Sequence, residues 1–587
     1  MSEVGHLWER LEDYAGKDFY PYHMPGHKRR SWGRLPEEIY GIDITEIEGF
    51  DNLHQPEGIL RDLQREAARL YGAEESFYLV NGSSCGILSA VSCAVPFRGH
   101  ILMARNCHRS AYHAAYLRKL TMHYVYPPFL DEYDVFDGVE PGQIQEALEQ
   151  DGEIDAVLIV SPTYEGRIAD VAGIARAVHQ RGIPLIVDEA HGAHLGLVEG
   201  FASNSCQLGA DLVIHSVHKT LPALTQTALL HVNGDRIDRE RLRRFLRIYQ
   251  SSSPSYLLMA GIDNALQYAK EDNDAFNRFK ERYESMVRNL TDSCRHLRFL
   301  PVEEGKQDVG KLLISVKRCS LTGRQLYDIL LQKYHLQLEM ASVSFVLAMF
   351  TVNDGEEAYR RMTQALTEID GSLRGEKAEK DFRGFETAGY AERHSEPGAE
   401  NIEKRYKRLS ADNFAERRKD SDPERLGYRR KVPDVESFGE RGAGDYRENQ
   451  EERTCKGRGE NQEKTSHRAN GKRIKRRLCE EGCDSSRDHR KKRERWEGSR
   501  TDAIPLAEAW DRETEMISLE ESIGRPIGEF INLYPPGVPL LVPGEPMTER
   551  LCREIRNALE QGLQVQGVHR EKCRGEAREE IFVPVIL

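Results

Sequence analysis

Two hydrophobic patterns alternate between about residues 41 and 250. Short apolar runs, typical of buried strands, are separated by segments in which apolar residues recur every three or four positions, as on one face of a helix. The predicted strands are Phe77–Val80, Ile101–Ala104, Ala156–Val160, Pro184–Val187, Leu212–Ile214 and Ala228–Val232. The predicted helices are Gly86–Val95, Arg109–Leu120, Pro141–Gln150 and Asp170–Gln180. This alternation predicts an α/β domain with a mostly parallel sheet, helices on both faces and ligands at the carboxyl ends of the strands.

The pattern changes on either side of this region. Residues 256–370 predict a smaller α+β domain, and residues 503–587 a C-terminal α+β domain. The elements of the smaller domain are a long helical stretch (Leu257–Leu290), strands Lys311–Val316 and Ser342–Thr351, and helices Thr322–Tyr334 and Glu356–Ile369. In the last segment we predict helices at Leu519–Ile523 and Met547–Gln561. We therefore expect five parts: an N-terminal arm (1–40), a large domain (41–255), a small domain (256–370), an insert (371–502) and a C-terminal domain (503–587).

The insert differs from the rest in composition. Residues 371–500 hold 35 Lys or Arg, 28 Asp or Glu and only eight Ile, Leu, Val or Met. Such a segment buries too little apolar surface to offset chain entropy, so it is predicted to be mostly disordered. Its basic clusters at 472–477 and 490–495 leave nucleic-acid binding open, but the interleaved acids favour a solvated insert. It is either a lineage-specific loop or a reading-frame artefact.

Bulk properties narrow the class of protein. The 587 residues carry a net charge of −13, and they contain neither a run of 18 apolar residues nor a secretory leader. A cytoplasmic location without membrane contact is therefore expected. The 11 cysteines form no CxxC pair, and Cys479 with Cys483 lacks further ligands, so free thiols and no metal are predicted.

A lysine follows one of the predicted strands. Lys219 comes after the apolar run Leu212–Ile214 and before the small-residue segment 223–228. An amine at the end of a strand at the sheet edge lies in a cleft, where it can form a covalent bond with an aldehyde. A lone lysine is more often a solvated surface group, so the argument depends on its neighbours.

Two further features accompany Lys219. Asp188 ends another buried run, 31 residues earlier, and a Gly/Ser turn with Ser83 and Ser84 joins a strand to a helix. An enzyme that uses pyridoxal phosphate (PLP) needs a lysine for the cofactor aldehyde and an acid to keep the pyridine nitrogen protonated. It also needs free N–H groups and hydroxyls for the phosphate, which such a turn provides. The three features together predict a PLP enzyme.

These residues resemble the Orn/Lys/Arg decarboxylase family of fold type I PLP enzymes. Ser216-Val-His-Lys-Thr, with Thr225-Gln-Thr-Ala after it, is similar to the family's attachment signature. The resemblance covers about 5–370 and 505–570, and the chain resembles a short form without the N-terminal wing domain. Further matching motifs are Pro25-Gly-His-Lys28, Asp43-Ile-Thr-Glu-Ile, Asp51-Asn-Leu-His54, Asn106-Cys-His-Arg109, Ser161-Pro-Thr-Tyr, Ser253-Pro-Ser255 and Tyr534-Pro-Pro-Gly-Val-Pro-Leu-Leu-Val-Pro-Gly-Glu545.

The resemblance assigns roles residue by residue. It implies that His108 stacks on the pyridine ring, and a helix-capping or surface histidine is the alternative. Lys219, His218 and Asp188 are the expected catalytic residues, with Lys219 or His218 returning a proton to Cα. The expected cofactor-binding residues are Ser83, Ser84, Cys85, His108, Thr163, Asp188, His191, Ser216, His218 and Lys219.

The implied reaction is removal of CO₂ from a basic amino acid, with arginine favoured over lysine and ornithine. A cationic side chain needs a carboxylate, and the candidates are Glu46, Asp51, Glu339 and Glu545. An aminotransferase or lyase is the alternative, although Ser342–Thr351 lacks the arginine that binds the substrate carboxylate in aminotransferases. A chain inactivated by the insert is another. A homodimer is expected, in which Ser253–Ser255 reach the partner's phosphate.

Overall fold

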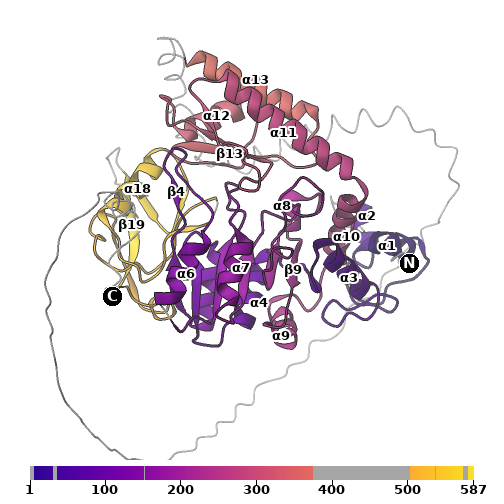
Figure 1. The fold of residues 1–587 in the computed structure, drawn as a ribbon. Coiled ribbons are helices and arrows are strands. Elements are labelled where there is room, and N and C mark those ends of the chain that lie inside the picture. The colour runs from indigo at the N-terminus through magenta and orange to yellow at the C-terminus, as the bar shows by residue number, and fades with distance from the viewer. Residues whose placement is uncertain (1–4, 31–35, 151, 374–502, 536, 573–578) are drawn as a thin grey trace, which may run out of the picture. The chain divides into compact units, whose positions relative to one another are not determined.

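The computed structural model describes residues 5–30, 36–150, 152–373, 503–535, 537–572 and 579–587, all within one compact unit (Figure 1). Apart from residues 371–373, the predicted insert lies outside the described residues, and so do its basic clusters and Cys455, Cys479 and Cys483. None of the helices that the structure describes is long and apolar enough to cross a membrane. The cytoplasmic location stays a prediction.

The main sheet has seven strands in the order β1-β9-β8-β7-β6-β2-β3. All neighbouring pairs from β8 to β3 are parallel, and only β9 runs antiparallel to its two neighbours. The mostly parallel sheet is thus confirmed. Its strands are β1 (Glu75–Leu79), β2 (His100–Ala104), β3 (Thr121–Val125), β6 (Ala156–Val160), β7 (Leu185–Asp188), β8 (Leu212–His215) and β9 (Ala228–Val232).

Helices cover both faces of this sheet, as predicted. Every residue of β7, β8 and β9 is buried, and strand side chains point alternately to opposite faces, so neither face is open. α4 packs against α5 and α9, whereas α6 packs against α7, and the last two lie side by side in Figure 1. These helices are α4 (Gly82–Ala94), α5 (Arg109–Arg118), α6 (Pro141–Gln150), α7 (Val171–His179) and α9 (Arg239–Tyr249).

The small domain is built on a four-stranded antiparallel sheet, in the order β10-β11-β13-β12. The helical stretch predicted for 257–290 is confirmed, and it consists of two helices that meet at Asp272, whose carboxylate accepts a hydrogen bond from Ala275 N and caps the second. The elements are α10 (Tyr256–Glu271), α11 (Asn273–Ser293), β10 (Arg298–Phe299), β11 (Lys311–Ser315), α12 (Gly323–Lys333), β12 (Met340–Ala341), β13 (Phe345–Met349) and α13 (Glu356–Ser372).

The C-terminal domain has its own apolar cluster and two three-stranded sheets, β14-β19-β18 and β16-β15-β17. The predicted helix Leu519–Ile523 is wrong, since these residues form a turn closed by Ser522 N donating to Ser518 O. The later helix is confirmed and is capped by Thr548. The elements are α17 (Leu506–Ala509), β14 (Thr514–Ser518), β15 (Ile531–Leu533), β16 (Pro539–Leu541), α18 (Glu549–Glu560), β17 (Val565–Gln566), β18 (His569–Lys572) and β19 (Glu579–Ile586).

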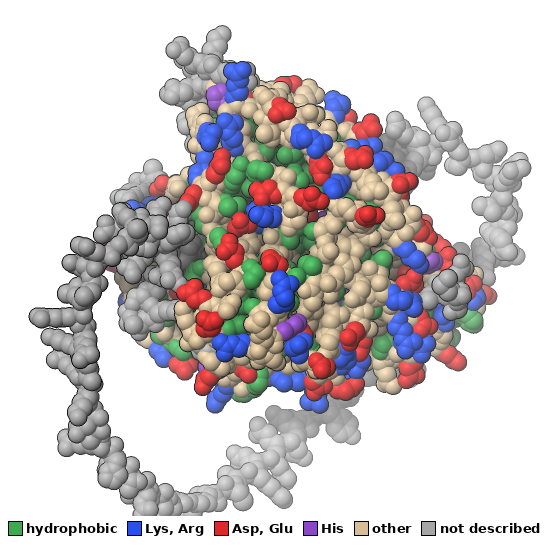
Figure 2. All heavy atoms as spheres, in the orientation of Figure 1, with side chains coloured by type: hydrophobic (Ala, Val, Ile, Leu, Met, Phe, Trp, Pro, Cys, Tyr) green, Lys and Arg blue, Asp and Glu red, His purple; other side chains and the backbone are tan. Residues whose placement is uncertain are grey.

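Three helices precede the main sheet. α1 packs against α2 and α10, and its Leu7 and Leu11 side chains are fully buried. Figure 2 shows Lys and Arg interspersed with Asp and Glu on the visible face of the molecule. The remaining elements are α1 (Leu7–Gly16), α2 (Glu37–Ile42), α3 (Ile59–Tyr71), β4 (Phe129–Leu130), β5 (Val135–Phe136) and α8 (Val217–Thr220).

Candidate active site

The carboxyl ends of β7 and β8 bring the two principal candidates together. The strands are parallel neighbours, with Asp188 at the end of β7 paired in register with Ile214 of β8. β8 continues through Ser216 into the short helix α8, which carries Lys219. Asp188 and Lys219 therefore lie at the same edge of the sheet, close enough for each charge to affect the pKa of the other group.

Lys219 is largely enclosed by protein. Its Nζ atom lies 3.0 Å from Nε2 of His191. Burial lowers the pKa of Lys219 below its usual value, and the charges of Asp188 and Glu339 partly oppose that shift. The amine is thus closer to its neutral, nucleophilic form than an exposed lysine would be.

Asp188 is an acid with few partners. Its side chain is buried, and one carboxylate oxygen accepts a hydrogen bond from Ala190 N at 3.2 Å. Burial raises the pKa of Asp188, whereas Lys219 lowers it. A buried carboxylate is costly unless a cation pairs with it, and a protonated ring nitrogen would be such a partner.

His108 has one of the two roles considered from the sequence. It is the N-cap of α5, with Nδ1 accepting from Ser110 N. Burial, assisted by the charge of Lys219, lowers the pKa of His108 to about 4, so the ring is neutral near pH 7. Gly537 lies against the ring, since a Cβ there would stand 3.3 Å from His108 Nε2. The capping role is therefore observed, whereas stacking on a cofactor stays a prediction.

The start of α4 fits a phosphate. Ser83 and Ser84 lie in its first turn, whose backbone N–H groups have no partners within the helix, and no side chain caps them. Gly86 holds this turn close to β8, because a Cβ there would come within 3.0 Å of Ile214. Ser216 Oγ, at the end of β8, is buried without a hydrogen-bond partner among the described residues. Gly82 N donates to Gln226 O, so the donors left for a phosphorylated ligand are the following N–H groups of this turn and the Ser216 hydroxyl.

Three other predicted cofactor residues are already engaged by protein groups. Cys85 donates its thiol to Gly82 O at 3.1 Å, and burial raises its pKa to about 12. Thr163 Oγ1 accepts from Arg167 N at 3.1 Å. His218 Nδ1 lies 2.9 Å from Thr227 O, and a carbonyl only accepts, so Nδ1 carries the proton and Nε2 is the basic nitrogen.

Two of the four predicted substrate carboxylates have structural partners instead. Asp51 accepts from the backbone N–H groups of Glu57, Gly58 and Leu60, and so anchors the start of α3. Glu545 forms an ion pair of 2.9 Å with Arg105. Both carboxylates make contacts within the chain, which favours a structural role for them, and their assignment to substrate binding stays a prediction.

The other two acids differ in position. Glu339 accepts a hydrogen bond from Tyr164 OH, and its charge acts on both Lys219 and Lys311, so it belongs to the site. Glu46 lies instead where its charge acts on Tyr256. Of the four predicted substrate carboxylates, only Glu339 lies near Lys219 according to the described contacts of the single chain.

The sequence did not identify two members of the site. Lys311 at the start of β11 is 2% exposed and lies 2.8 Å from His191 Nδ1. Tyr164 contacts the His191 ring edge-on, with 5.0 Å between ring centroids. A signal for the first existed: Lys311 opens a strand in which all five residues are buried, and a buried lysine is rare without a partner.

The Arg105 ion pair also anchors the C-terminal domain beside the site. Arg105 is 4% exposed and donates to the carbonyls of Pro539 and Leu540 in addition to Glu545. Arg109 N donates to Gly537 O at 3.2 Å. The described residues after the insert thus pack against the part of the large domain that contains His108.

Replacing Glu545 with glutamine is expected to lower the free energy of unfolding by about 2 kcal/mol, because it leaves Arg105 buried without its counter-ion. Denaturant unfolding measures this loss. Glu560→Gln, at an exposed position of α18, is the matched control and should change little. A raised KM for substrate with unchanged stability would contradict the structural assignment and restore Glu545 as a substrate ligand.

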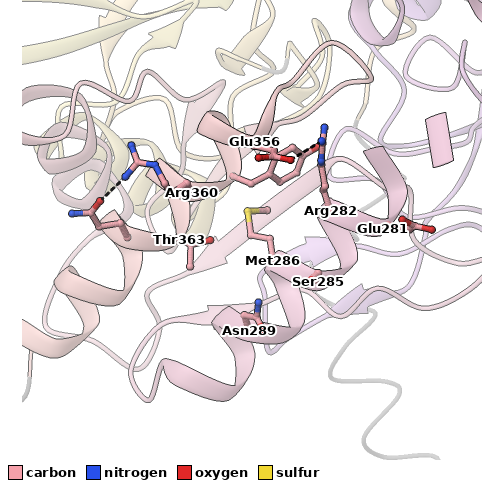
Figure 3. Close-up of a pocket in the computed structure, with 10 residues that line it drawn as sticks. Glu281, Arg282, Ser285, Met286, Asn289, Glu356, Arg360 and Thr363 are labelled. Carbon is pink, nitrogen blue, oxygen red and sulfur yellow. Dashed lines mark hydrogen bonds and ion pairs between the residues drawn. The ribbon is translucent and has the colours of Figure 1, made fainter. Parts of the chain in front are cut away.

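A separate groove lies between α11 and α13 (Figure 3), with a volume of about 580 Å³. Met286 and Thr363 line it, and Arg282 pairs with Glu356 at 3.0 Å. None of the residues discussed around Lys219 lines this groove, so it is not part of the candidate active site.

Comparison with known proteins identifies the family. The model of the Orn/Lys/Arg decarboxylase major domain matches residues 6–303, and that of the C-terminal domain of the same family matches residues 497–578. The chain is 39% identical to the uncharacterized protein YaaO of Bacillus subtilis over 45% of this chain and 56% of that protein. It is 24% identical to the arginine decarboxylase of Bacillus anthracis over 96% of this chain and 94% of that enzyme.

Solved structures agree at the level of the fold. The constitutive lysine decarboxylase of Escherichia coli superposes with a TM-score of 0.67 at 18% identity, over 99% of this chain and 82% of that one. The family model covers half of the chain, and the parallel sheet, the buried lysine and the docked C-terminal domain are all present. The chain belongs to the Orn/Lys/Arg decarboxylase family, whose members are PLP-dependent amino-acid decarboxylases of fold type I.

Proposed function

We propose that this decarboxylase acts on arginine and that Lys219 is the residue that binds its PLP cofactor. The main observation is the buried Lys219 amine at the end of β8, facing Asp188 on the adjacent strand. Arginine is favoured because three relatives that align over at least 94% of their own length are named arginine decarboxylases.

The residues present fit the cofactor. Lys219 provides the amine for the cofactor aldehyde, and Asp188 provides the anion that keeps the ring nitrogen protonated. Ser216 Oγ and the first turn of α4, with Ser83 and Ser84, provide donors for the phosphate. Bound there, PLP supplies an electron-accepting ring for the electron pair that is left on Cα when CO₂ departs.

The remaining task is to return a proton to Cα. Lys219 and His218 are the candidates, because burial lowers the pKa of both groups and so favours their neutral forms. The hydrogen bond from His218 Nδ1 to Thr227 O holds the ring in one tautomer, with Nε2 as the basic atom. Neutral His108 adds no positive charge beside Lys219.

Glu339 is the proposed partner of the substrate's side-chain cation. One oxygen accepts from Tyr164 OH, which fixes the orientation of the carboxylate. A planar guanidinium donates to a carboxylate through two N–H groups, so an oriented carboxylate suits arginine. Glu339 is thus the acid that the structure offers for specificity.

A homodimer is the proposed assembly. Residues of the N-terminal arm expose large apolar side chains, as expected of a surface that another subunit covers. Light scattering of the purified protein tests this assembly. The exposed side chains are Phe19, Tyr20, Tyr22 and Met24, which are 58–89% exposed.

The test of function is CO₂ release by purified protein with PLP, offered arginine, lysine and ornithine separately. Release from arginine alone is the expected result. Release only from lysine or ornithine would overturn the proposed substrate. Absence of release from all three, with PLP attached to Lys219, would overturn the proposed reaction and favour an aminotransferase or lyase.

The same assay tests Glu339. Glu339→Gln removes the charge opposite the guanidinium, and KM for arginine is expected to rise about 10- to 100-fold, because a hydrogen bond to a charged group contributes about 1.5–3 kcal/mol. Glu304→Gln, at an exposed position on a neighbouring loop, is the control and should leave KM unchanged. An equal KM in both variants would remove Glu339 from the substrate site.

A further inference from the structure

His191 lies between two lysines. Its Nε2 atom is 3.0 Å from Lys219 Nζ, and its Nδ1 atom is 2.8 Å from Lys311 Nζ. All three groups are buried or largely enclosed, and Lys311 comes from the small domain, whereas Lys219 and His191 come from the large one. Each of the two lysine amines thus contacts a different nitrogen of the same imidazole.

Counting protons restricts how these contacts can form. A neutral imidazole has one N–H donor and one accepting nitrogen, whereas an ammonium group only donates. Burial, together with the charges of Lys311 and Lys219, lowers the pKa of His191 well below its usual value, so the ring is neutral. Two ammonium groups therefore cannot both hydrogen-bond to it, and one of the two lysines must be a neutral amine.

A charge on Lys311 would have anionic partners. Asp308 is 1% exposed, and its Oδ1 accepts from His194 Nε2 at 2.7 Å, while its Oδ2 has no hydrogen-bond partner among the described residues. Burial lowers the pKa of Lys311 to about 8, which still leaves most of this amine protonated at pH 7. The groups whose charges act on Lys311 are Asp308, Lys219, Glu339 and Glu165.

Lys219 also has anions nearby, one of which the cofactor would engage. Asp188 and Glu339 attract its charged form, and the nearby His108, His191 and His218 are all held neutral by burial. In the proposed function Asp188 is the partner of the cofactor ring. A lysine that is to bond an aldehyde must also be deprotonated when it reacts.

We infer that Lys311 is a positioning residue for Lys219: its ammonium donates to His191 Nδ1, which places the imidazole proton on Nε2, facing Lys219 as a free amine. This inference rests on the proposed role of Lys219. Gly166 lies close against the side chain of Lys311, because a Cβ at position 166 would stand 2.7 Å from Lys311 Cγ. Tyr164 holds the His191 ring from its edge.

The same arrangement can pass a proton to Lys219. Transfer from Lys311 Nζ to His191 Nδ1, with release of the proton on Nε2 to Lys219 Nζ, leaves Lys311 neutral and Lys219 charged. The imidazole is neutral before and after, and no net charge enters or leaves the three groups. Lys219 can therefore gain its proton without contact with water.

The test measures loading of the cofactor-free protein. Apoprotein is mixed with PLP at pH 6 to 10, trapped with borohydride and digested, and the fraction modified at Lys219 is measured by mass spectrometry. Lys311→Met removes the donor to Nδ1, so the ring is free to accept from a Lys219 ammonium. The pH midpoint of loading is expected to rise by about one unit, and the rate at pH 7 to fall about 10-fold.

Two comparisons identify the cause. Lys311→Arg keeps the charged donor and is expected to keep the wild-type midpoint. In a His191→Phe background the shift caused by Lys311→Met should vanish, because the ring that connects the lysines is gone. If Lys311→Met does not fold, Lys311→Gln replaces it, and its uncharged amide is expected to give a smaller upward shift.

Each remaining outcome is decisive. An unchanged midpoint in Lys311→Met, or in Lys311→Gln where that variant is used, would overturn the inference and leave the proposed function intact. A shift that persists without His191 would overturn the route through the imidazole. Failure of the unsubstituted protein to load at Lys219 would overturn the proposed site, and this inference with it.

Discussion

Lys219→Ala is expected to lower CO₂ release by a factor on the order of 10⁴ or more and to abolish covalent attachment of PLP. The residue contributes both the amine that bonds the cofactor and a candidate proton donor for Cα, so both contributions disappear together. Borohydride trapping should link PLP to the Lys219 peptide in the unsubstituted protein only.

The control for this variant is Lys306→Ala, at an exposed position, which should retain both turnover and trapping. Wild-type turnover by Lys219→Ala would remove Lys219 from the mechanism. Trapping of PLP at Lys311 instead would assign the attachment role to the other buried lysine of the site.

Asp188→Asn is expected to reduce turnover about 10²- to 10⁴-fold, equivalent to roughly 3–5 kcal/mol in the barrier. The amide has nearly the same shape but no charge, so it cannot stabilise a protonated ring nitrogen, and the ring becomes a weaker electron acceptor. Covalent attachment at Lys219 should persist, which distinguishes this variant from Lys219→Ala. Steady-state CO₂ release and borohydride trapping measure the two properties.

Asp292→Asn, at an exposed position near the end of α11, is the control. Undiminished turnover in Asp188→Asn would mean that another group neutralises the ring nitrogen. Loss of attachment as well as turnover would indicate that Asp188 acts on Lys219 itself, whose pKa it raises.

Most of the strands that were predicted correctly are almost fully buried and have uninterrupted apolar runs, whereas β1 was predicted although it lies at an edge of the sheet. β3 was missed because it lies at the edge of the sheet, where His123 and Tyr124 need only partial burial. The turn at 519–523 contains enough apolar residues to resemble a helix, but Gly524, with a φ of +82°, ends it after one turn.

Prediction of the site residues also depended on a local sequence pattern. Lys219, Asp188 and the turn at Ser83 were found because each follows a recognisable strand. Lys311 becomes a site residue only when the small domain folds against the large one, and Tyr164 only when it packs against His191, and no local pattern records either contact. The ion pair of Glu545 could not be predicted for the same reason, because its partner Arg105 lies 440 residues away in sequence.

The contact between His108 and Gly537 also sets an order of events during synthesis. The two residues are separated by 429 positions, which a ribosome adding 5–20 residues per second covers in roughly 20 to 90 s. The large domain is complete early in that interval, with Lys219 and Asp188 in place but His108 uncovered. Gly537 can pack against His108 only after the last part of the chain has been synthesised. In a nascent or truncated protein Lys219 is therefore less enclosed than in the complete one.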